Sequence, residues 1–282
     1  MTFRLRPIAA TVLALAAVLG LTVAANSYLT ERDISAFEAR VATLGAASPA
    51  PAAMPAALAS LPPPVQRYVR YTFPEGPVRY GVVRLSASGE FRRPQKQDFQ
   101  PTTAGQVIAA GVPALVFSAT TPIAGALWAR AYDFFADGKM EMKAKILSTV
   151  TVVDEKETPT LNEISLRRWL LESPLYPAAL LPGGPVTWEA LDEDRARAVV
   201  TWGTLRASMV AHFDPQGRLT HMQAETDGDL STPYHGSGEH VQRSNYQRVG
   251  AQMIPMDFTI SRLSGGKLYP FWKGRIDHIR FE

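Results

Sequence analysis

Four charged side chains, the first of them Glu163, interrupt an otherwise apolar stretch of the chain between residues 160 and 181. Arg167, Arg168 and Glu172 lie within six positions of one another. Arg168 and Glu172 are four positions apart, so on a helix they share one face and can pair there. One hypothesis is that this face presents a charged cluster to a ligand. The structural alternative is an intrahelical ion pair beside a solvated Arg167. Burial of Arg168 distinguishes the two, because an unpaired buried charge is costly.

Aromatic residues accompany this charged face and recur in apolar segments elsewhere. Core packing is the ordinary explanation for such residues, but ligand pockets are also mainly apolar with a few placed polar groups. The candidate ligand-binding residues that combine both features are Arg168, Trp169, Glu172, Trp188, Tyr246 and Trp272.

The histidines show no tight metal-binding spacing, so we predict neither a metal nor a cofactor. They are His212, His221, His235, His240 and His278. His235 and His240 lie in a Gly-rich stretch with nearby acidic residues, where zinc or calcium binding is the alternative to a polar surface loop. Gly236-Ser237-Gly238 is not a nucleophile elbow, because the strand-to-helix context of that motif is absent. A Ser/His/Asp triad meets only in the fold, so an envelope hydrolase stays an alternative function.

The first 25 residues predict the compartment. Arg4 and Arg6 precede an uncharged run from Ile8 to Ala25, which has the pattern of a signal peptide or a short membrane span. Val23-Ala24-Ala25 offers small residues for cleavage, which would give a secreted protein. The two arginines place the N-terminus in the cytoplasm, so either interpretation predicts a periplasmic or cell-surface domain.

Residues 26–41 favour an uncleaved membrane anchor over a cleaved signal. Ile34, Phe37, Val41 and Leu44 repeat at helical spacing, so we predict a juxtamembrane amphipathic helix over 26–41. Residues 42–64 contain nine Ala and six Pro, a composition typical of an extended, semi-rigid linker.

The charge and cysteine content exclude some partners and attachments. Without Arg4 and Arg6, the net charge of the 282-residue chain falls from +3 to +1, and no run of five basic residues occurs. A nucleic-acid partner is therefore not expected. The chain has no Cys, so it has neither disulfides nor a lipid-carrying cysteine.

From residue 65 the chain predicts a single β-rich extracytoplasmic domain, 65–282. Asp137-Gly138 separates two strand-like segments, and Met140, Met142, Ala144 and Ile146 alternate with charged residues in the second. That pattern indicates a hairpin with one buried and one wet face. Further hairpins follow at short spacing, with strands at 196–202, 205–213, 219–224, 241–249, 253–263, 267–272 and 274–281. Consecutive hairpins predict an antiparallel meander.

A helical island, residues 160–181, interrupts the strands, and we call it the plug. Thr160 and Glu163 have capping-box spacing, and the segment is apolar around most of its circumference, so it is expected to be buried on several sides. The expected fold is therefore mainly β (α+β): a large curved antiparallel sheet or half-barrel holding the helical plug, preceded by the N-terminal helix.

Motifs in and around the plug resemble an uncharacterised bacterial family of exported or membrane-anchored proteins, a domain of unknown function. They are Arg168-Trp169-Leu170-Leu171-Glu172, Tyr176-Pro177-Ala178-Ala179-Leu180-Leu181-Pro182 and Val186-Thr187-Trp188-Glu189. The resemblance spans about residues 61–282 and implies a shared fold but no activity. By architecture alone the chain is also similar to periplasmic lipoprotein carriers.

The leading functional hypothesis is a membrane-tethered, non-enzymatic binding or carrier domain. Its ligand would be an apolar or amphipathic molecule, such as a lipid, held between the curved sheet and the plug. This hypothesis requires a cavity of a few hundred Å³. A structural or interaction module of the cell envelope, with a filled core and an exposed apolar patch, is the other alternative.

Overall fold

One antiparallel sheet organises the domain in this computed structural model, which describes residues 5–50, 55–93, 96–228, 230 and 238–282. Over these residues the sheet has 13 strands in the order β6-β5-β4-β3-β2-β1-β13-β12-β11-β10-β9-β8-β7. The strands are β1 (Val82–Arg92), β2 (Phe99–Ala109), β3 (Ala114–Ala124), β4 (Leu127–Ala136), β5 (Lys139–Ile146), β6 (Val150–Lys156), β7 (Val186–Ala190), β8 (Arg195–Trp202), β9 (Leu205–Phe213), β10 (Leu219–Gln223), β11 (His240–Val249), β12 (Gln252–Ser264) and β13 (Lys267–Phe281).

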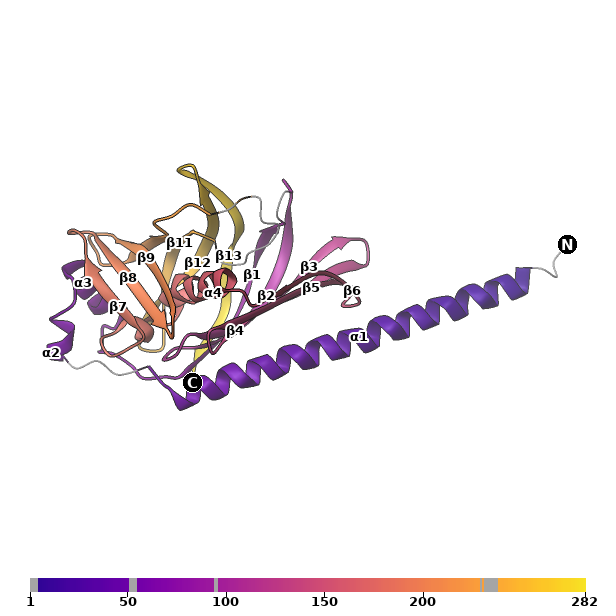
Figure 1. Cartoon of the computed structure of the whole chain (residues 1–282), viewed down its shortest axis with the longest axis horizontal. Helices are drawn as coiled ribbons and strands as arrows, with labels where there is room; N and C mark the ends of the chain where they lie inside the picture. The colour runs from indigo at the N-terminus through magenta and orange to yellow at the C-terminus, as the bar shows by residue number, and fades with distance from the viewer. Residues whose placement is uncertain (1–4, 51–54, 94–95, 229, 231–237) are drawn as a thin grey trace.

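The sheet curves without closing, and β6 and β7 are its two edges. The strands form two meanders, β1 to β6 and β7 to β13, that join where β1 pairs with β13. Figure 1 shows the sheet wrapping around α4 (Pro159–Glu172). The predicted half-barrel and its plug are thereby confirmed.

The plug consists of α4 followed by two short 3-10 helices, η1 (Ser173–Leu175) and η2 (Pro177–Leu180). Its N-cap differs from the predicted capping box, because Thr158 rather than Thr160 accepts the hydrogen bond from the backbone N–H of Leu161, at 3.1 Å. Pro159 at the first helical position explains the shift, since proline is favoured at N1 and sets the residue before it as the cap.

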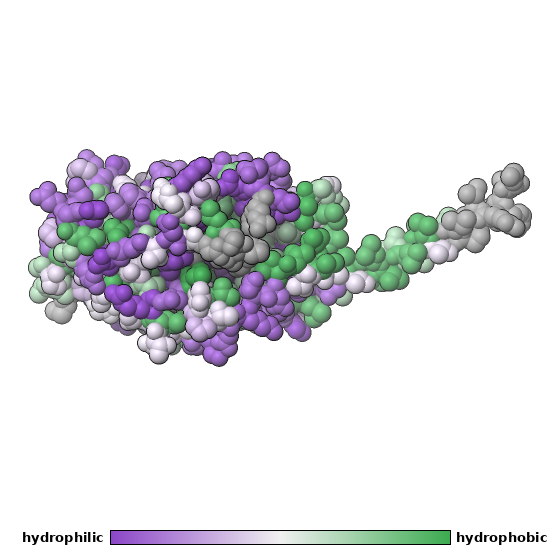
Figure 2. Space-filling view, turned by 45° about the horizontal axis from the view of Figure 1, so that its top comes forward, coloured by the Kyte–Doolittle hydropathy of each residue, from purple (hydrophilic) through white to green (hydrophobic). Residues whose placement is uncertain are grey.

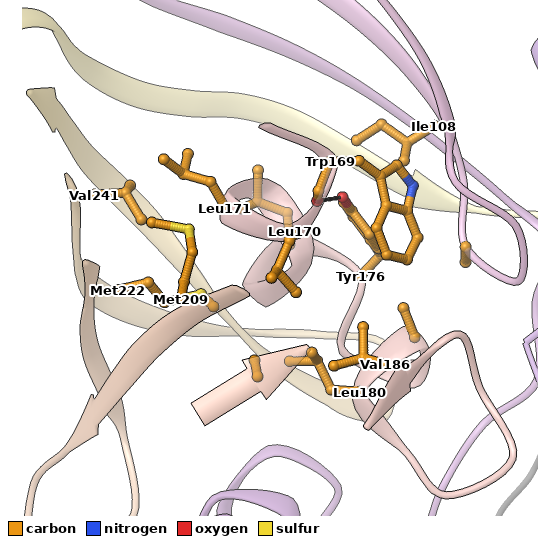
Figure 3. Close-up of a cluster of buried hydrophobic side chains, with 14 of the residues drawn as sticks. Ile108, Trp169, Leu170, Leu171, Tyr176, Leu180, Val186, Met209, Met222 and Val241 are labelled. Carbon is orange, nitrogen blue, oxygen red and sulfur yellow. Dashed lines mark hydrogen bonds between the residues drawn. The ribbon is translucent and has the colours of Figure 1, made fainter. Parts of the chain in front are cut away.

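The plug packs mainly against the second meander. Leu170 and Leu171 meet Met209, Met222 and Val241 of the strands (Figure 3), and both leucines are fully buried. This apolar layer packs against the β8–β11 side of the sheet and forms the main core there.

Helix α1 (Leu5–Ala47) is continuous and packs its C-terminal part on the outer face of the sheet. Ile34 and Val41 are buried, and Phe37 stacks on Phe134 of β4 with ring centroids 4.2 Å apart. The predicted apolar seam is therefore the face that contacts the sheet. Within the described residues, α1 is one helix that is long and apolar enough to cross a membrane, and its apolar window is exposed (Figure 1).

Residues 42–64 differ from the extended linker that their composition suggests. Their first six residues continue α1, and α2 (Pro55–Leu58) and the start of α3 (Pro63–Thr72) follow. Ala50 is buried, and its N–H donates to the carbonyl oxygen of Tyr80 at 3.0 Å. Burial of Ala50 against the domain thus holds the described end of this segment, before residue 51, in place.

Several strand boundaries also differ from those read in the sequence. The predicted hairpin at Asp137-Gly138 forms with positive φ at both residues. The segment after it divides into β5 and β6 around Leu147 and Ser148, which also have positive φ. Conversely, the two predicted strands on either side of Lys273 are the single strand β13.

Candidate functional site

An apolar cavity of about 310 Å³ lies on the concave face of the first meander. Alternate residues of three neighbouring strands line it: Phe117, Ala119, Thr121 and Ile123 of β3, Ala129, Ala131 and Asp133 of β4, and Met142, Ala144 and Ile146 of β5. Side chains two positions apart share a face of a strand, so the alternation predicted for residues 140–146 places its apolar side in this cavity.

Small residues create the space. Ala119, Ala131 and Ala144 are neighbours across β3, β4 and β5 in the strand register. Larger side chains complete the opposite walls, including Phe91 of β1 together with Phe271 and Trp272 of β13. The volume is at the lower end of the range for small-molecule pockets, ~300–1,000 Å³.

An ion pair lies at the inner end of the cavity. Arg168 of α4 pairs with Asp133 of β4, and both side chains are buried, at 7% and 5% exposed. The guanidinium carbon of Arg168 is 4.6 Å from the centroid of the Phe117 ring, in a cation–π contact. The cavity therefore combines mostly apolar walls with a buried ion pair at its inner end, an arrangement that accommodates an amphipathic molecule.

A second, much smaller cavity of about 10 Å³ adjoins the first behind Phe117, Ile260 and Trp272. Glu172 of α4 and Arg243 of β11 line it and pair at 2.7 Å, with the Arg243 side chain fully buried. Its volume is about that of one water molecule, so this second space extends the polar inner end without being a ligand pocket of its own.

The three charged residues Arg167, Arg168 and Glu172 of the plug pair with residues outside their own helix. Arg167 pairs with Glu239 at 2.8 Å, while Arg168 and Glu172 pair with Asp133 and Arg243. Burial lowers the pKa of Arg167, against the opposing effect of Glu239. The structural alternative of an intrahelical Arg168–Glu172 pair is thus wrong, because each of these side chains pairs with a residue of the sheet instead.

The six candidate ligand-binding residues fall into separate places. Arg168 and Trp272 line the apolar cavity, and Glu172 with Trp272 lines the small one. Trp169 is fully buried, packs on Tyr176 (Figure 3) and donates from Nε1 to the carbonyl oxygen of Ala109 at 3.0 Å. It therefore packs inside the protein core, away from the apolar cavity.

Trp188 and Tyr246 lie on β7 and β11 of the second meander. Trp188 donates from Nε1 to the carbonyl oxygen of Leu180 at 2.9 Å. The Tyr246 hydroxyl donates to the carbonyl oxygen of Leu219 at 2.9 Å, and burial raises the pKa of this hydroxyl well above its usual value. Neither residue lines the apolar cavity.

Most of the residues that line the cavity were not among the candidates, including Asp133 and Phe117, the two that contact Arg168. A signal for Asp133 was present, because Ala129, Ala131, Asp133 and Phe135 alternate as the inward face of β4, and an acid on such a face needs a buried partner. That the partner is Arg168, 35 residues away, follows only from the fold.

Three histidines stack on the sheet outside the cavity. The ring centroids of His212 and His221 are 3.9 Å apart, and those of His221 and His240 are 5.3 Å apart. Burial, together with the neighbouring rings, lowers the pKa of His212 and of His240 to about 4. His278 is exposed, whereas His235 and the Gly236-Ser237 part of the serine motif lie outside the described residues.

The described part of the chain holds no group of three or more His, Cys, Asp or Glu residues placed to bind a metal ion. Glu239, one of the acids near the suggested His240 site, is engaged with Arg167 and with the backbone N–H of Leu263 at 3.1 Å. Its carboxylate thus serves to connect the plug with β12.

Comparison with solved structures finds distant similarities. An outer membrane lipoprotein-sorting protein domain from Vibrio parahaemolyticus is 9% identical with a TM-score of 0.34, over 72% of this chain and 86% of that one. A β-barrel-like protein of the domain of unknown function DUF1849 from Brucella abortus is 12% identical with a TM-score of 0.28, over 73% of this chain and all of that one.

Comparison of the amino-acid sequence with known proteins and protein families identifies a family. None of the curated proteins matches the chain. A family model described as a family of unknown function, DUF6920, matches residues 59–281, which contain the whole sheet and the plug. The match covers well over half of the chain, and the chain therefore belongs to the DUF6920 family.

Proposed function

We propose that the domain binds or carries an apolar or amphipathic molecule in the apolar cavity of the first meander. The single observation that carries this proposal is the cavity itself: about 310 Å³ in volume, walled by alternate apolar side chains of β3, β4 and β5. Protein interiors are normally close-packed. A space of this size, lined by neighbouring alanines where larger residues would fill it, is therefore a feature that needs an occupant.

The chemistry of the walls indicates the class of ligand. A hydrocarbon chain suits the apolar length of the cavity, and a polar end suits the Arg168–Asp133 pair at its inner end. Single-chain lipids such as fatty acids combine these two parts, so we propose a lipid-like ligand of this class.

Binding is better supported than hydrolysis. Asp133, the carboxylate in the cavity, is engaged by Arg168, whereas general-base catalysis needs a group free to take a proton. His212, His221 and His240, the stacked rings, are not among the residues that line the cavity.

We further propose that α1 anchors this domain to a membrane and that the domain is extracytoplasmic. The apolar, exposed N-terminal part of α1 supports the anchor, and Arg4 and Arg6 support the orientation. The continuity of α1 through Ala25 into the packed segment supports retention of the helix.

The test fills the cavity and measures binding. The full chain is titrated with a fluorescent polyene fatty acid, and energy transfer from Trp272 in the cavity wall reports binding. Ala144→Phe and Ala131→Phe place a ring in the space, so each is expected to lower affinity by about tenfold or more. Organic extracts of the purified proteins, compared by mass spectrometry, should contain a bound lipid only for the wild type.

Ala190→Phe is the matched control, because Ala190 is exposed on β7. Its affinity should equal that of the wild type, and thermal unfolding should show all three variants folded. Unchanged affinity in the folded Ala144→Phe and Ala131→Phe variants would refute the proposal.

A further inference from the structure

We propose that the mouth of the apolar cavity faces the bilayer that α1 crosses, and that the tips of two hairpins dock on that bilayer. The hairpins are β3–β4 and β5–β6, and the cavity would exchange its ligand directly with the membrane. The exchange rests on the proposed binding function, whereas the docking is independent of it.

The direction of the strands fixes which end of the cavity is open. Along β3 the lining runs from Phe117, beside the Arg168–Asp133 pair, to Ile123, next to the β3–β4 turn. Six residues of strand span ~20 Å. Ile146 at the end of β5 and Val152 near the start of β6 line the same end as Ile123. The polar pair is therefore deep, and the two hairpin tips, with the exposed Arg93 that follows β1, form the mouth.

Contacts between α1 and the sheet show that the helix runs in the same direction as the cavity, from its inner end towards its mouth. Arg40 pairs with Asp137 at the opposite end of β4, away from the mouth. Nearer the mouth, the Glu31 carboxylate accepts two hydrogen bonds from Arg130, at 2.7 and 2.9 Å, and Thr30 accepts one from Lys145 at 3.1 Å. Towards its N-terminus, α1 therefore runs past the mouth and leaves the domain there (Figure 1).

The length of the apolar segment places the membrane surface at the level of the two hairpin tips. The 18 residues from Ile8 to Ala25 make ~27 Å of helix, close to the ~30 Å hydrocarbon core of a bilayer. Ser27 follows only two residues later and already lines a groove with Trp128 of β4 and Ser148 of the β5–β6 turn. The hairpin tips thus lie within about one helical turn of the point where α1 enters the bilayer.

Apolar side chains at these tips are exposed. Leu127 of β4 is 44% exposed, and Val150 and Val152 of β6 are 59% and 53% exposed. Figure 2 shows hydrophobic residues gathered at the end of the domain from which the helix leaves. Tyr28, 70% exposed, and Trp128 provide the aromatic residues that favour the membrane interface. The exposed patch is continuous with the membrane segment, so the bilayer, rather than a second protein, is its partner.

The first experiment measures docking in the full chain, reconstituted in vesicles of phosphatidylethanolamine and phosphatidylglycerol. The native chain has no Cys, so Leu127→Cys and Val150→Cys each carry one fluorophore. A nitroxide on the lipid head groups should quench these two labels at least ~3-fold more than a label at Lys139→Cys. Lys139 is exposed at the other end of β5 and is the matched control.

Equal quenching at all three positions would overturn the docking. A second outcome would also overturn the docking. If the lipid nitroxide does not quench the labels at the mouth, and these labels become shielded from solvent as the protein concentration rises, a second protein covers the patch instead.

The second experiment measures exchange. The Leu127→Asp/Val150→Asp variant should take up the fluorescent fatty acid from vesicles about tenfold more slowly, because charged tips cannot insert. Its affinity for the same probe added from solution should stay within about twofold of the wild type. Equal uptake from vesicles by both proteins would overturn the exchange route. Quenched labels in a protein that binds no probe would leave the docking intact and refute the binding function instead.

Discussion

At the scale of single residues, the plug is defined by where its buried charges find partners. Arg168 pairs with Asp133 of the first meander and Glu172 with Arg243 of the second. Buried ion pairs add little net stability, but removal of one partner leaves a costly unpaired charge. These pairs therefore hold the plug in one orientation and place a polar group at the inner end of an otherwise apolar cavity.

The histidine stack belongs to the same scale and gives a pH dependence. Because burial lowers the pKa of His212 and of His240 to about 4, the unfolded chain, with histidine pKa values near ~6.5, binds more protons between these two values. The free energy of unfolding should therefore fall as the pH falls from ~6.5 towards ~4. After allowance for partial exposure, we expect a loss of about 2 kcal/mol between pH ~7.5 and pH ~5.

Urea unfolding of the wild type and of a His212→Gln/His240→Gln variant at these two pH values checks the expectation. The variant should lose about half as much stability or less. A loss equal to that of the wild type would assign the pH dependence to other groups.

At the scale of elements, α1 is one helix whose two parts have different surroundings. Its first part is an exposed apolar segment, and its last part, from Thr30, is a component of the domain. Val41 is fully buried in a second core with Val82, Val107 and Val116 on the outer face of the sheet. This segment covers apolar strand surface that would otherwise face water.

A charge placed in this contact should destabilise the whole domain. Val41→Asp buries an unpaired carboxylate and removes apolar contact, so we expect about 3 kcal/mol or more of lost stability. Ala39→Asp, on the exposed side of the same helix, should change stability by less than about 0.5 kcal/mol. Thermal unfolding followed by the circular dichroism of the sheet measures both. Similar melting temperatures for both variants would mean that α1 contributes no fold stability.

Sequence patterns predicted which helices and strands form more accurately than they predicted where each begins and ends. The seam of Ile34, Phe37 and Val41 predicted an amphipathic helix but not its contact with the sheet, because helical periodicity indicates an apolar face without saying what that face contacts. Composition misled at residues 42–64, where an Ala/Pro-rich stretch has helical turns and a buried Ala50. Local preference is weak in such a segment, so contact with the domain decided the position of Ala50.

At the scale of the whole molecule, the pairing of β1 with β13 joins the two meanders into one sheet. Gly89 lies opposite Gly274 at this junction. A Cβ on Gly274 would lie 2.3 Å from the carbonyl oxygen of Ser88, and one on Gly89 would lie 2.2 Å from that of Lys273. Glycine at Gly274 therefore permits close approach within a continuous strand, whereas from sequence alone the same residue suggests a strand boundary.

Gly274→Ala tests this junction. The added methyl group must push the two strands apart, so we expect a loss of about 1–3 kcal/mol in unfolding free energy. Gly105→Ala in β2 is the matched control, because its Cβ would meet its nearest neighbour, Ser118 Oγ, at an ordinary 3.8 Å. The control should be neutral or slightly stabilising. Chemical denaturation measures both, and equal stabilities would show that the junction tolerates a side chain.

The sequence by itself determined the parts of this protein that depend on local periodicity. Alternation along residues 140–146 predicted a buried face, and in the structure this face lines the cavity. The apolar run predicted a signal or membrane segment, which is the exposed part of α1, and the plug was recognisable as a helix apolar on most sides. Each is a pattern within a few residues, which a chain expresses before any long-range contact forms.

Only the tertiary structure decided which side chains meet. It paired Arg168 with Asp133 instead of Glu172, and it brought Trp272 to the cavity while placing Trp169, Trp188 and Tyr246 elsewhere. The curvature of the sheet and the position of the plug set these contacts. Neither is encoded at a fixed spacing, because residues from distant strands reach one cavity only after every hairpin between them has taken its register.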